Sequence, residues 1–583
     1  MSARRLVRVA AMLAAAGALA VVAGAAHGAL DPLNDLFAVG QGTGDSPAAA
    51  PVVHRAEPPS GATPLVPCGP GSRPQPGVDG RVPAGSATNG LWCNVALVGH
   101  QGTEGGFKVF RYIDAGGHEC AFYDTTLMFP LNALNPGAGS EGVAVLDMSN
   151  PSHPVQTDTL ATTPMLSPHE SLNLNPKRGL LAAVNGNLAT EPGFVSIYDV
   201  HADCRHPVLQ SNGPFARFGH ESGFSSDGKT FYATSTALQA ITAIDVTNPK
   251  TPHAVWQGNV YSHGMSLSNG GNRAYIADPK GNMLILDTSQ IQARRPNPQV
   301  REVSRLTWNS VSIPQNAIPF TEGGHPYVLE FDEYDQSTLN PNGNPNVVGE
   351  ARIIDIADET RPFIVSNLRL QVDEPADHAA AANDPGGNGA PQGYAAHYCN
   401  IPTRVDPKVV ACSFIASGLR IFNIADVVHP KEIGYFVAPP QPRSENGYKA
   451  SDFAMSMPAF APERREVWWS DGTSGFYVLR VDKSVWPQTS PPRAQKCQSR
   501  RRLLVKARVP RGTRVRSVRA TLRGKRTRVV RRRRGFYAVA DLRRVPRGTT
   551  RLVIRVRLTN GRTVTTRRTY RLCTRPLRRS PRR

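Results

Sequence analysis

The sequence has few of the features that mark a dithiol oxidoreductase, a zinc ribbon or a membrane protein with several spans. Its 8 cysteines include no Cys-x-x-Cys pair, which excludes the usual dithiol and zinc-ribbon motifs. Beyond residue 26, no apolar run is long enough to cross a bilayer. The chain has instead 52 glycines and 50 prolines in 583 residues, a composition that favours a folded protein with many turns.

Signatures of common hydrolases are missing as well. The His-Glu dipeptides at His169 and His220 lack the second histidine that a zinc-protease helix requires, and no Gly-x-Ser-x-Gly elbow occurs. A sustained 3.6-residue period is also missing between residues 89 and 488, where apolar runs are short, β-branched and interrupted by Gly and Pro. The pattern predicts an all-β protein and does not assign a reaction.

The N-terminus has the order of an export signal. Arginines at positions 4, 5 and 8 precede an apolar run over residues 9–26, and small residues follow. This order predicts a secretory signal peptide over residues 1–28, with an uncleaved membrane anchor as the alternative. We expect an exported protein, extracellular or associated with the cell envelope, in which the even number of cysteines forms disulfides. The expected pairs are Cys399 with Cys412 and Cys497 with Cys573.

One sequence element recurs seven times. An apolar strand that ends in Asp is followed by a turn and a proline, in copies that begin at Gly142, Phe194, Ile241, Met283, Ala351, Leu419 and Phe476. In five copies the proline comes seven residues after the Asp position, as Pro154 follows Asp147. The fourth copy has a displaced proline, and the seventh has Arg480 in place of Asp.

A second element, with a strand, a polar turn and another strand, precedes five of these copies, beginning at His169, His220, His263, His397 and Ser456. Together the two elements predict sheets of three or four antiparallel strands, each of which must stack on its neighbours to bury both faces. We therefore expect a seven-bladed β-propeller over residues 89–488, after a Pro/Gly-rich segment over residues 29–88. An open solenoid is the rival architecture.

These strands resemble the LVIVD repeat family, whose name describes the strand that MLILD, ARIID and AVLD reproduce here. The resemblance extends over about 400 residues, from Leu91 to Trp486. It implies a bacterial cell-surface or exported β-propeller, and it implies no catalytic activity.

Four histidines occupy one equivalent position of the repeat, namely His169, His220, His263 and His397. If they lie on the innermost strands, they converge on a central channel, where imidazoles bind copper, zinc or iron. The fifth repeat has Gln315 or Asn316 at this position and the seventh has Ser456. The alternative is that each histidine forms a hydrogen bond within its own blade.

An acidic cluster in the fifth repeat is a weaker candidate for the same metal site. Glu330, Asp332 and Glu333 follow one another closely, with His325 nearby. Their carboxylates would either complete the metal site or face solvent.

Residues 493–583 have 34 basic residues, 31 of them Arg, and a single acid, Asp541. They contribute +33 to a net charge of +22, which leaves −11 for the rest. Alternating apolar and Arg residues predict an Arg-rich β-sandwich over residues 497–576, between a linker (489–496) and a basic tail (577–583). The pattern resembles the Ig-like domains of exported actinobacterial proteins. We expect it to bind anionic cell-envelope polymer or a membrane surface rather than nucleic acid, with a merely soluble charged face as the alternative.

Two functional hypotheses follow. The first is an exported, non-enzymatic interaction scaffold that binds a protein or glycan through its propeller loops. The second is a metal-dependent redox enzyme with a histidine-lined channel. The sequence does not indicate the ligand, the cofactor or the oligomeric state.

Overall fold

The computed structural model describes residues 44–572, except for residues 59–60, 126–141, 186–191, 237–238, 336–346, 388–392, 441–451, 488–501, 511–512, 533–534, 544 and 547. The chain divides into two units, Met1–Pro487 and Gln488–Arg583. The expected signal peptide, the linker, the basic tail, Cys497 and Cys573 lie outside the described residues. In the part of the chain that the structure describes, none of the helices has the length and apolar character needed to span a membrane.

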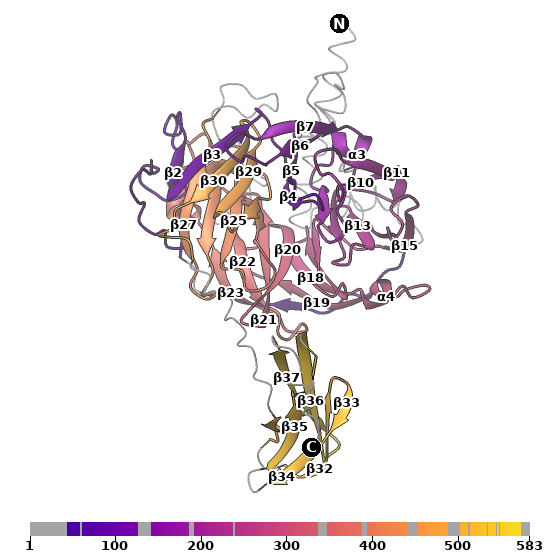
Figure 1. Cartoon of the computed structure of the whole chain (residues 1–583). Coiled ribbons are helices and arrows are strands. Elements are labelled where there is room, and N and C mark those ends of the chain that lie inside the picture. The colour runs from indigo at the N-terminus through magenta and orange to yellow at the C-terminus, as the bar shows by residue number, and fades with distance from the viewer. Residues whose placement is uncertain are drawn as a thin grey trace, which may run out of the picture. The chain divides into compact units, whose positions relative to one another are not determined.

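The described residues of the first unit form seven sheets, each with four antiparallel strands, and two of these sheets have a fifth strand (Figure 1). The first three contain β4 (Val109–Ile113), β5 (Glu119–Asp124), β6 (Val143–Asp147) and β7 (Val155–Leu160); β8 (Asn173–Asn175), β9 (Leu180–Val184), β10 (Gly193–Asp199) and β11 (Val208–Ala216); and β12 (Glu221–Phe224), β13 (Thr230–Thr234), β14 (Ile241–Asp245) and β15 (His253–Gly258). The next three contain β16 (Met265–Leu267), β17 (Arg273–Asp278), β18 (Asn282–Asp287) and β19 (Arg301–Thr307); β20 (Ile313–Glu322), β21 (His325–Glu333), β22 (Ala351–Asp355) and β23 (Phe363–Leu368); and β24 (Ala396–Asn400), β25 (Val409–Phe414), β26 (Gly418–Asn423) and β27 (Lys431–Val437). The last contains β28 (Ala459–Ala461), β29 (Glu466–Asp471), β30 (Gly475–Val481) and β3 (Val95–Gln101). Short helices join some strands: α3 (Thr163–Leu166), α4 (Ser289–Gln292), η2 (Gln371–Asp373), α6 (Pro375–Ala380) and η3 (Ile415–Ser417).

The last sheet takes its fourth strand from the N-terminal end of the chain. Strand β3, which precedes the first sheet in sequence, pairs antiparallel with β30, with Val95 opposite Val481. The first strands of successive sheets also contact one another, as β8 does with β12 and β12 with β16. Sheets that stack through their faces and meet at their first strands are the architecture of a β-propeller, and the prediction of an all-β propeller is confirmed.

The seven copies of the repeat are the third strands of these sheets. Most of these strands are buried on both faces, because each sheet packs between two others. The terminal Asp has a local role, since its Oδ1 accepts a hydrogen bond from the backbone N–H two residues later. Asp147 accepts from Ser149 at 2.8 Å and Asp245 from Thr247 at 2.7 Å. This turn directs the chain from the third strand into the fourth.

The divergent seventh copy forms the same turn two residues later. Asp482 accepts from the Ser484 N–H at 2.7 Å, whereas Arg480 pairs with Glu466 at 2.7 Å. The Asp that the repeat lacks at position 480 is thus replaced by a neighbouring one.

Three disulfides join described cysteines: Cys68–Cys93, Cys120–Cys204 and Cys399–Cys412. The prediction of the last pair is confirmed, and these two residues face each other across β24 and β25. Disulfides of this number indicate an oxidising, non-cytoplasmic compartment.

The segment before the propeller packs against its sheets. Strand β1 (Val52–His54) runs parallel to β19, and β2 (Leu91–Cys93) adds a fifth strand beside β27. Asp79 lies 3.1 Å from the buried Arg420. The described residues between 44 and 94 are therefore part of the folded unit.

The second unit has two antiparallel sheets in its described residues, ordered β31-β35-β34 and β33-β32-β36-β37. Their strands are β31 (Arg502–Lys506), β32 (Val515–Leu522), β33 (Lys525–Thr527), β34 (Val529–Arg532), β35 (Gly535–Asp541), β36 (Gly548–Leu558) and β37 (Thr563–Leu572). One core includes Ala538 and Ala540 from the first sheet and Leu552, Ile554 and Val556 from the second. An Ig-like topology for this unit stays a prediction.

Candidate metal centre

The four repeated histidines come from four different sheets. His220 directly precedes β12, and His263 lies two residues before β16. His397 lies in β24, and His169 lies between α3 and β8. Three of them are almost inaccessible, with exposed fractions of 3% for His220, 4% for His263 and 0% for His397. Because β8, β12, β16 and β24 are all first strands of their sheets, the repeat brings these side chains toward one another.

The Nε2 atoms of all four histidines face the carboxylate of Glu170. The distances to its nearer oxygen are 3.1 Å for His220, 3.2 Å for His397, 3.4 Å for His263 and 3.8 Å for His169. Glu170 itself is 2% exposed and accepts a hydrogen bond from Gln315 Nε2 at 2.7 Å. One buried carboxylate is therefore shared by four imidazoles and an amide.

A second carboxylate approaches the same ring nitrogens from β21. Glu333 lies 3.4 Å from His263 Nε2 and 3.3 Å from His397 Nε2. Its predicted companions have another partner, since Glu330 and Asp332 lie 2.7 Å and 3.0 Å from the buried Arg352. Of the acidic cluster, the structure brings Glu333 to the histidines, and His325 pairs instead with Asp355 at 2.5 Å.

Backbone carbonyls fix the orientation of two of the rings. The Nδ1 of His263 lies 2.9 Å from the Pro314 carbonyl, and that of His397 lies 2.7 Å from the Met455 carbonyl. A carbonyl only accepts, so each Nδ1 carries the proton and, in the neutral ring, each Nε2 presents a lone pair to the centre. This arrangement is the usual one for a histidine that binds a metal ion through Nε2.

Several ring nitrogens are buried without a hydrogen bond. Neither nitrogen of His220 has a hydrogen-bond partner, and Nε2 of His397 has none, although both rings lie at ion-pair distance from Glu170. The histidine Nε2 atoms lie 3.1–3.4 Å from the Glu170 oxygen. Two ligand atoms that both bind one metal ion at about 2.1 Å are separated by a similar distance. The distances and orientations therefore suit joint coordination of one ion.

Burial and the two carboxylates act in opposite directions on the histidine pKa values. Burial lowers the pKa of His169 to about 3, against a weaker opposing effect of Glu170. Burial also disfavours the charged form of His397, but the carboxylates of Glu170 and Glu333, 3.2 Å and 3.3 Å from its Nε2, raise its pKa to about 9. Although burial opposes it, the histidines hold the pKa of Glu170 well below its usual range. The two buried carboxylates thus stabilise positive charge beside them, which a proton on His397 or a metal cation supplies.

Local geometry supports this close packing. His169 has a φ of 48°, a left-handed conformation that is uncommon for residues other than glycine. Gly264 follows His263, and a Cβ there would lie 2.3 Å from the Gln315 carbonyl and 2.7 Å from Glu221. Phe107 covers one side, with ring-centroid distances of 4.4 Å to His169 and 5.6 Å to His397.

A second group, Asp114, His118 and Asp203, also has the spacing of metal ligands in the described residues. Its geometry has a local explanation. Asp114 accepts hydrogen bonds from His118 Nδ1 and from the Cys204 backbone N–H, both at 2.9 Å. This group is a useful control for the histidine centre.

Sequence reasoning missed Glu170, which it treated only as half of a failed protease dipeptide. The repeat contained a signal for this residue, because Glu170 and Glu221 occupy equivalent positions, and the structure pairs them across a parallel bridge.

One sequence motif is misleading in this chain. Residues 223–230 read Gly-x-x-x-x-Gly-Lys-Thr, but they form the β12–β13 hairpin rather than the strand–loop–helix of a phosphate-binding loop.

Comparison with known proteins identifies the repeat. The model of the LVIVD repeat matches residues 138–162 and 263–291. Two segments of this β-propeller thus match the LVIVD repeat. One matched LVIVD segment contains β6 and β7, and the other begins at His263 and continues through β16, β17 and β18.

The similar solved structures are distant. Periplasmic gluconolactonase of Pseudomonas aeruginosa is 14% identical, with a TM-score of 0.42 over 60% of this chain and 90% of that chain. A chain of the mitotic checkpoint complex is 11% identical, with a TM-score of 0.40 over 66% of this chain and 94% of that chain. Neither likeness extends to the chemistry of the LVIVD-repeat chain, and no curated protein matches it.

Proposed function

We propose that this chain is an exported, seven-bladed β-propeller that binds one transition-metal ion at its centre. His169, His220, His263 and His397 are the proposed ligands, with Glu170 as the carboxylate ligand and Glu333 beside it. The observation that carries the proposal is the convergence of four Nε2 atoms on one buried carboxylate at 3.1–3.8 Å. Imidazole-rich sites of this kind suit copper, iron or zinc.

The alternative, in which each histidine forms a hydrogen bond within its own blade, explains fewer of these contacts. It accounts for the Nδ1 contacts of His263 and His397, but it leaves Nδ1 of His220 buried without a hydrogen bond, and Nε2 of His220 faces only the Glu170 carboxylate at 3.1 Å. A buried polar group without a partner costs about 1–3 kcal/mol. A bound cation removes this cost and balances the two glutamates.

Elemental analysis of the secreted full-length protein tests the proposal. We expect one equivalent of copper, iron or zinc in the wild type and loss of that metal from a His220→Ala/His263→Ala variant. His118→Ala, in the group explained by local hydrogen bonds, is the matched control and should keep the metal. The proposal would be refuted if the wild-type protein were free of metal and also failed to bind added Cu²⁺, Fe²⁺ and Zn²⁺.

Redox chemistry at this centre, the second of the two initial hypotheses, requires a redox-active ion. Electron paramagnetic resonance of the protein as secreted distinguishes the cases. A Cu²⁺ or Fe³⁺ signal that disappears with ascorbate supports an oxidoreductase, whereas stoichiometric zinc supports a binding protein whose ion is structural or hydrolytic.

The second unit supports a separate proposal, association with anionic envelope polymer. The solvent-facing side of β36 carries Arg551, Arg555 and Arg557, and Arg519 stands directly opposite Arg555. In the described part of this unit the only ion pair joins Arg543 to Asp541. An arginine face without its own acids favours an anionic partner.

A further inference from the structure

A cavity of about 280 Å³ lies beside the histidine centre, in the described part of the propeller. Residues of several first strands line it, and they include both apolar side chains such as Phe110 and Met457 and polar ones such as Asn316. This size and this mixture are typical of a site for a small organic molecule rather than for a polymer.

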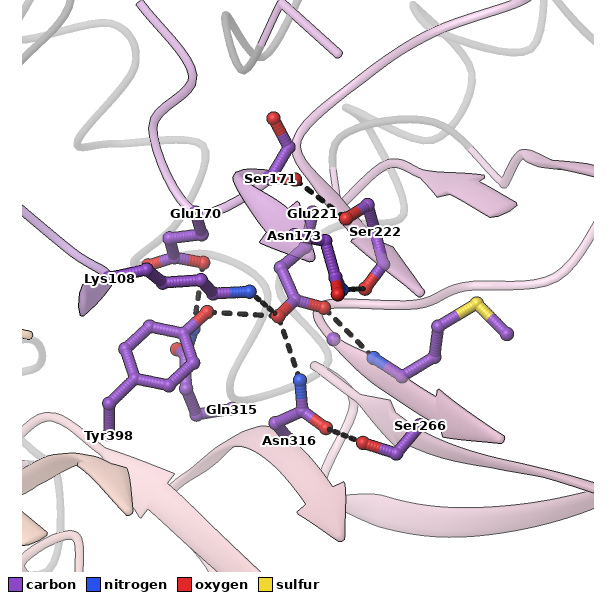
Figure 2. Close-up of polar contacts among 12 residues, drawn as sticks. Lys108, Glu170, Ser171, Asn173, Glu221, Ser222, Ser266, Gln315, Asn316 and Tyr398 are labelled. Carbon is purple, nitrogen blue, oxygen red and sulfur yellow. Dashed lines mark hydrogen bonds and ion pairs between the residues drawn. The ribbon is translucent and has the colours of Figure 1, made fainter. Parts of the chain in front are cut away.

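One wall of the cavity is formed by a hydrogen-bonded layer around Glu221, whose contacts Figure 2 shows. Oε1 of Glu221 accepts from Lys108 Nζ at 2.5 Å, from Asn316 Nδ2 at 2.7 Å and from the Tyr398 hydroxyl at 3.2 Å. Oε2 accepts from the Met265 backbone N–H at 2.9 Å. The buried charges of Lys108 and Glu221 thus compensate each other, and this wall is polar without a net charge.

The same layer connects the cavity to the proposed metal ligands. Gln315 Nε2 donates to Glu170 at 2.7 Å and to the Tyr398 hydroxyl at 2.9 Å, and Tyr398 donates to Glu221 (Figure 2). Glu170 and Glu221 hold equivalent positions in neighbouring sheets but have different partners. One faces four imidazoles, and the other faces the cavity.

Arg404 contributes a positive charge to the cavity lining. Its guanidinium donates to the Leu267 carbonyl, and no carboxylate of the described residues lies at ion-pair distance from it. Burial lowers its pKa to about 10, so it remains charged at neutral pH. An anion is the partner that this partly buried guanidinium lacks.

We infer that this cavity is the ligand site of the histidine centre and takes a small organic anion. The anionic group of the ligand pairs with Arg404, and its apolar part packs against Phe110 and Met457. The end of the ligand opposite the anionic group contacts the polar layer at Asn316. The link to the metal rests on the proposed function, whereas the anion site rests on the cavity and on Arg404 alone.

Isothermal titration of full-length protein tests the anion site. The probes are benzoate, hexanoate and phenyl phosphate, with benzyl alcohol as the neutral analogue of benzoate. We expect at least one anion to bind, with affinity reduced at least about tenfold in Arg404→Gln, since a charge-assisted hydrogen bond is lost. Carboxylates and the phosphate ester are compared to learn which anionic group fits. Arg301→Gln, at a side chain that is 71% exposed, is the matched control and should bind as the wild type does.

A second variant guards against misfolding of Arg404→Gln. Thr403 is exposed at the edge of the cavity, so Thr403→Trp should obstruct entry without disturbing the core, which circular dichroism and thermal melting check. Binding of none of the anions, equal binding of benzyl alcohol and benzoate, or full binding in both variants would overturn the anion site.

The link to the metal has its own readout. Bound Cu²⁺ should enhance the relaxation of the protons of a bound anion in the wild type but not in His220→Ala/His263→Ala. Anion binding that depends on Arg404 in protein free of metal retains the pocket and rejects the proposed function. If the protein binds metal but the relaxation of the bound anion's protons is not enhanced, the cavity is not the ligand site of the histidine centre.

Discussion

The propeller and the second unit both carry many charges, but they hold them in opposite ways. In the propeller, the buried charges of Glu170 and Glu221 have partners from several sheets at 2.5–3.4 Å, and Arg352 pairs with Glu330 of its own sheet at 2.7 Å. In the second unit, the described arginines of β36 face solvent, and like charges stand opposite each other, as Arg519 and Arg555 do. The first arrangement gives fixed geometry. The second gives long-range attraction that salt screens.

Removal of a buried partner should have the largest effect on stability. Arg352 is fully buried beside Glu330, Asp332 and Glu350, and it stacks on Trp308. Arg352→Met keeps much of the volume and leaves the carboxylates uncompensated, so we expect a loss of about 3–5 kcal/mol in the free energy of unfolding, measured with denaturant. Arg273→Met, at a partly exposed pair with Glu359, should cost no more than about 1 kcal/mol. Equal losses would contradict the contrast between buried and exposed charges.

Substitutions of the two equivalent glutamates, Glu170 and Glu221, should affect metal affinity and the free energy of unfolding differently. Glu170→Gln retains the shape but removes the charge that faces four imidazoles, so we expect metal affinity to fall by about a hundredfold, measured by competition with a chelator. Glu221→Gln should keep its metal and unfold more easily, because Lys108 then lacks its buried anion. Unchanged metal affinity in Glu170→Gln would remove this residue from the centre.

Attachment through the second unit should depend on ionic strength. We expect the full-length protein to sediment with isolated cell walls that contain anionic polymer, and its affinity to fall at least about tenfold between 0.05 and 0.5 M NaCl. A chain without residues 493–583 should be released into the medium. Retention of the truncated chain on cells would place the attachment elsewhere.

A single exposed arginine should matter least for folding. Arg555→Gln removes one charge opposite Arg519, and we expect the free energy of unfolding to change by no more than about 0.5 kcal/mol, with any change toward greater stability. Thermal melting of the full chain measures this. A clear loss of stability would mean that the arginine face has internal partners.

Much of the propeller could be predicted from the sequence because its repeat is local. The third strands and their terminal Asp turns, as at Asp147 and Asp245, depend on residues within one copy. Disulfide Cys399–Cys412 could also be predicted, because its cysteines flank one hairpin. The pairing of β3 with β30 could not, since no local pattern relates Val95 to Val481.

The histidine centre could be predicted only in part, because its contacts join residues that lie far apart in the sequence. The repeat gave the four histidines a shared position, and the structure brings their Nε2 atoms to one carboxylate. That this carboxylate is Glu170 depends on the backbone at His169, whose left-handed φ no spacing reveals. Likewise, Glu330 and Glu333 are near in sequence, but strand alternation and the position of Arg352 send them to different partners.

The return of β3 to the last sheet bears on how the chain acquires its structure. Residues 95–101 leave the translocation or synthesis machinery before any of the other sheets, yet their partner β30 arrives after all of them. Closure therefore cannot proceed one blade at a time from the N-terminus, and pairing of such distant segments makes folding slow. Until β30 arrives, both β3 and β29 keep an unpaired edge, the kind of edge that recruits other chains. Assembly of the ring is thus a late event, and the interval before it is when the protein is most open to aggregation.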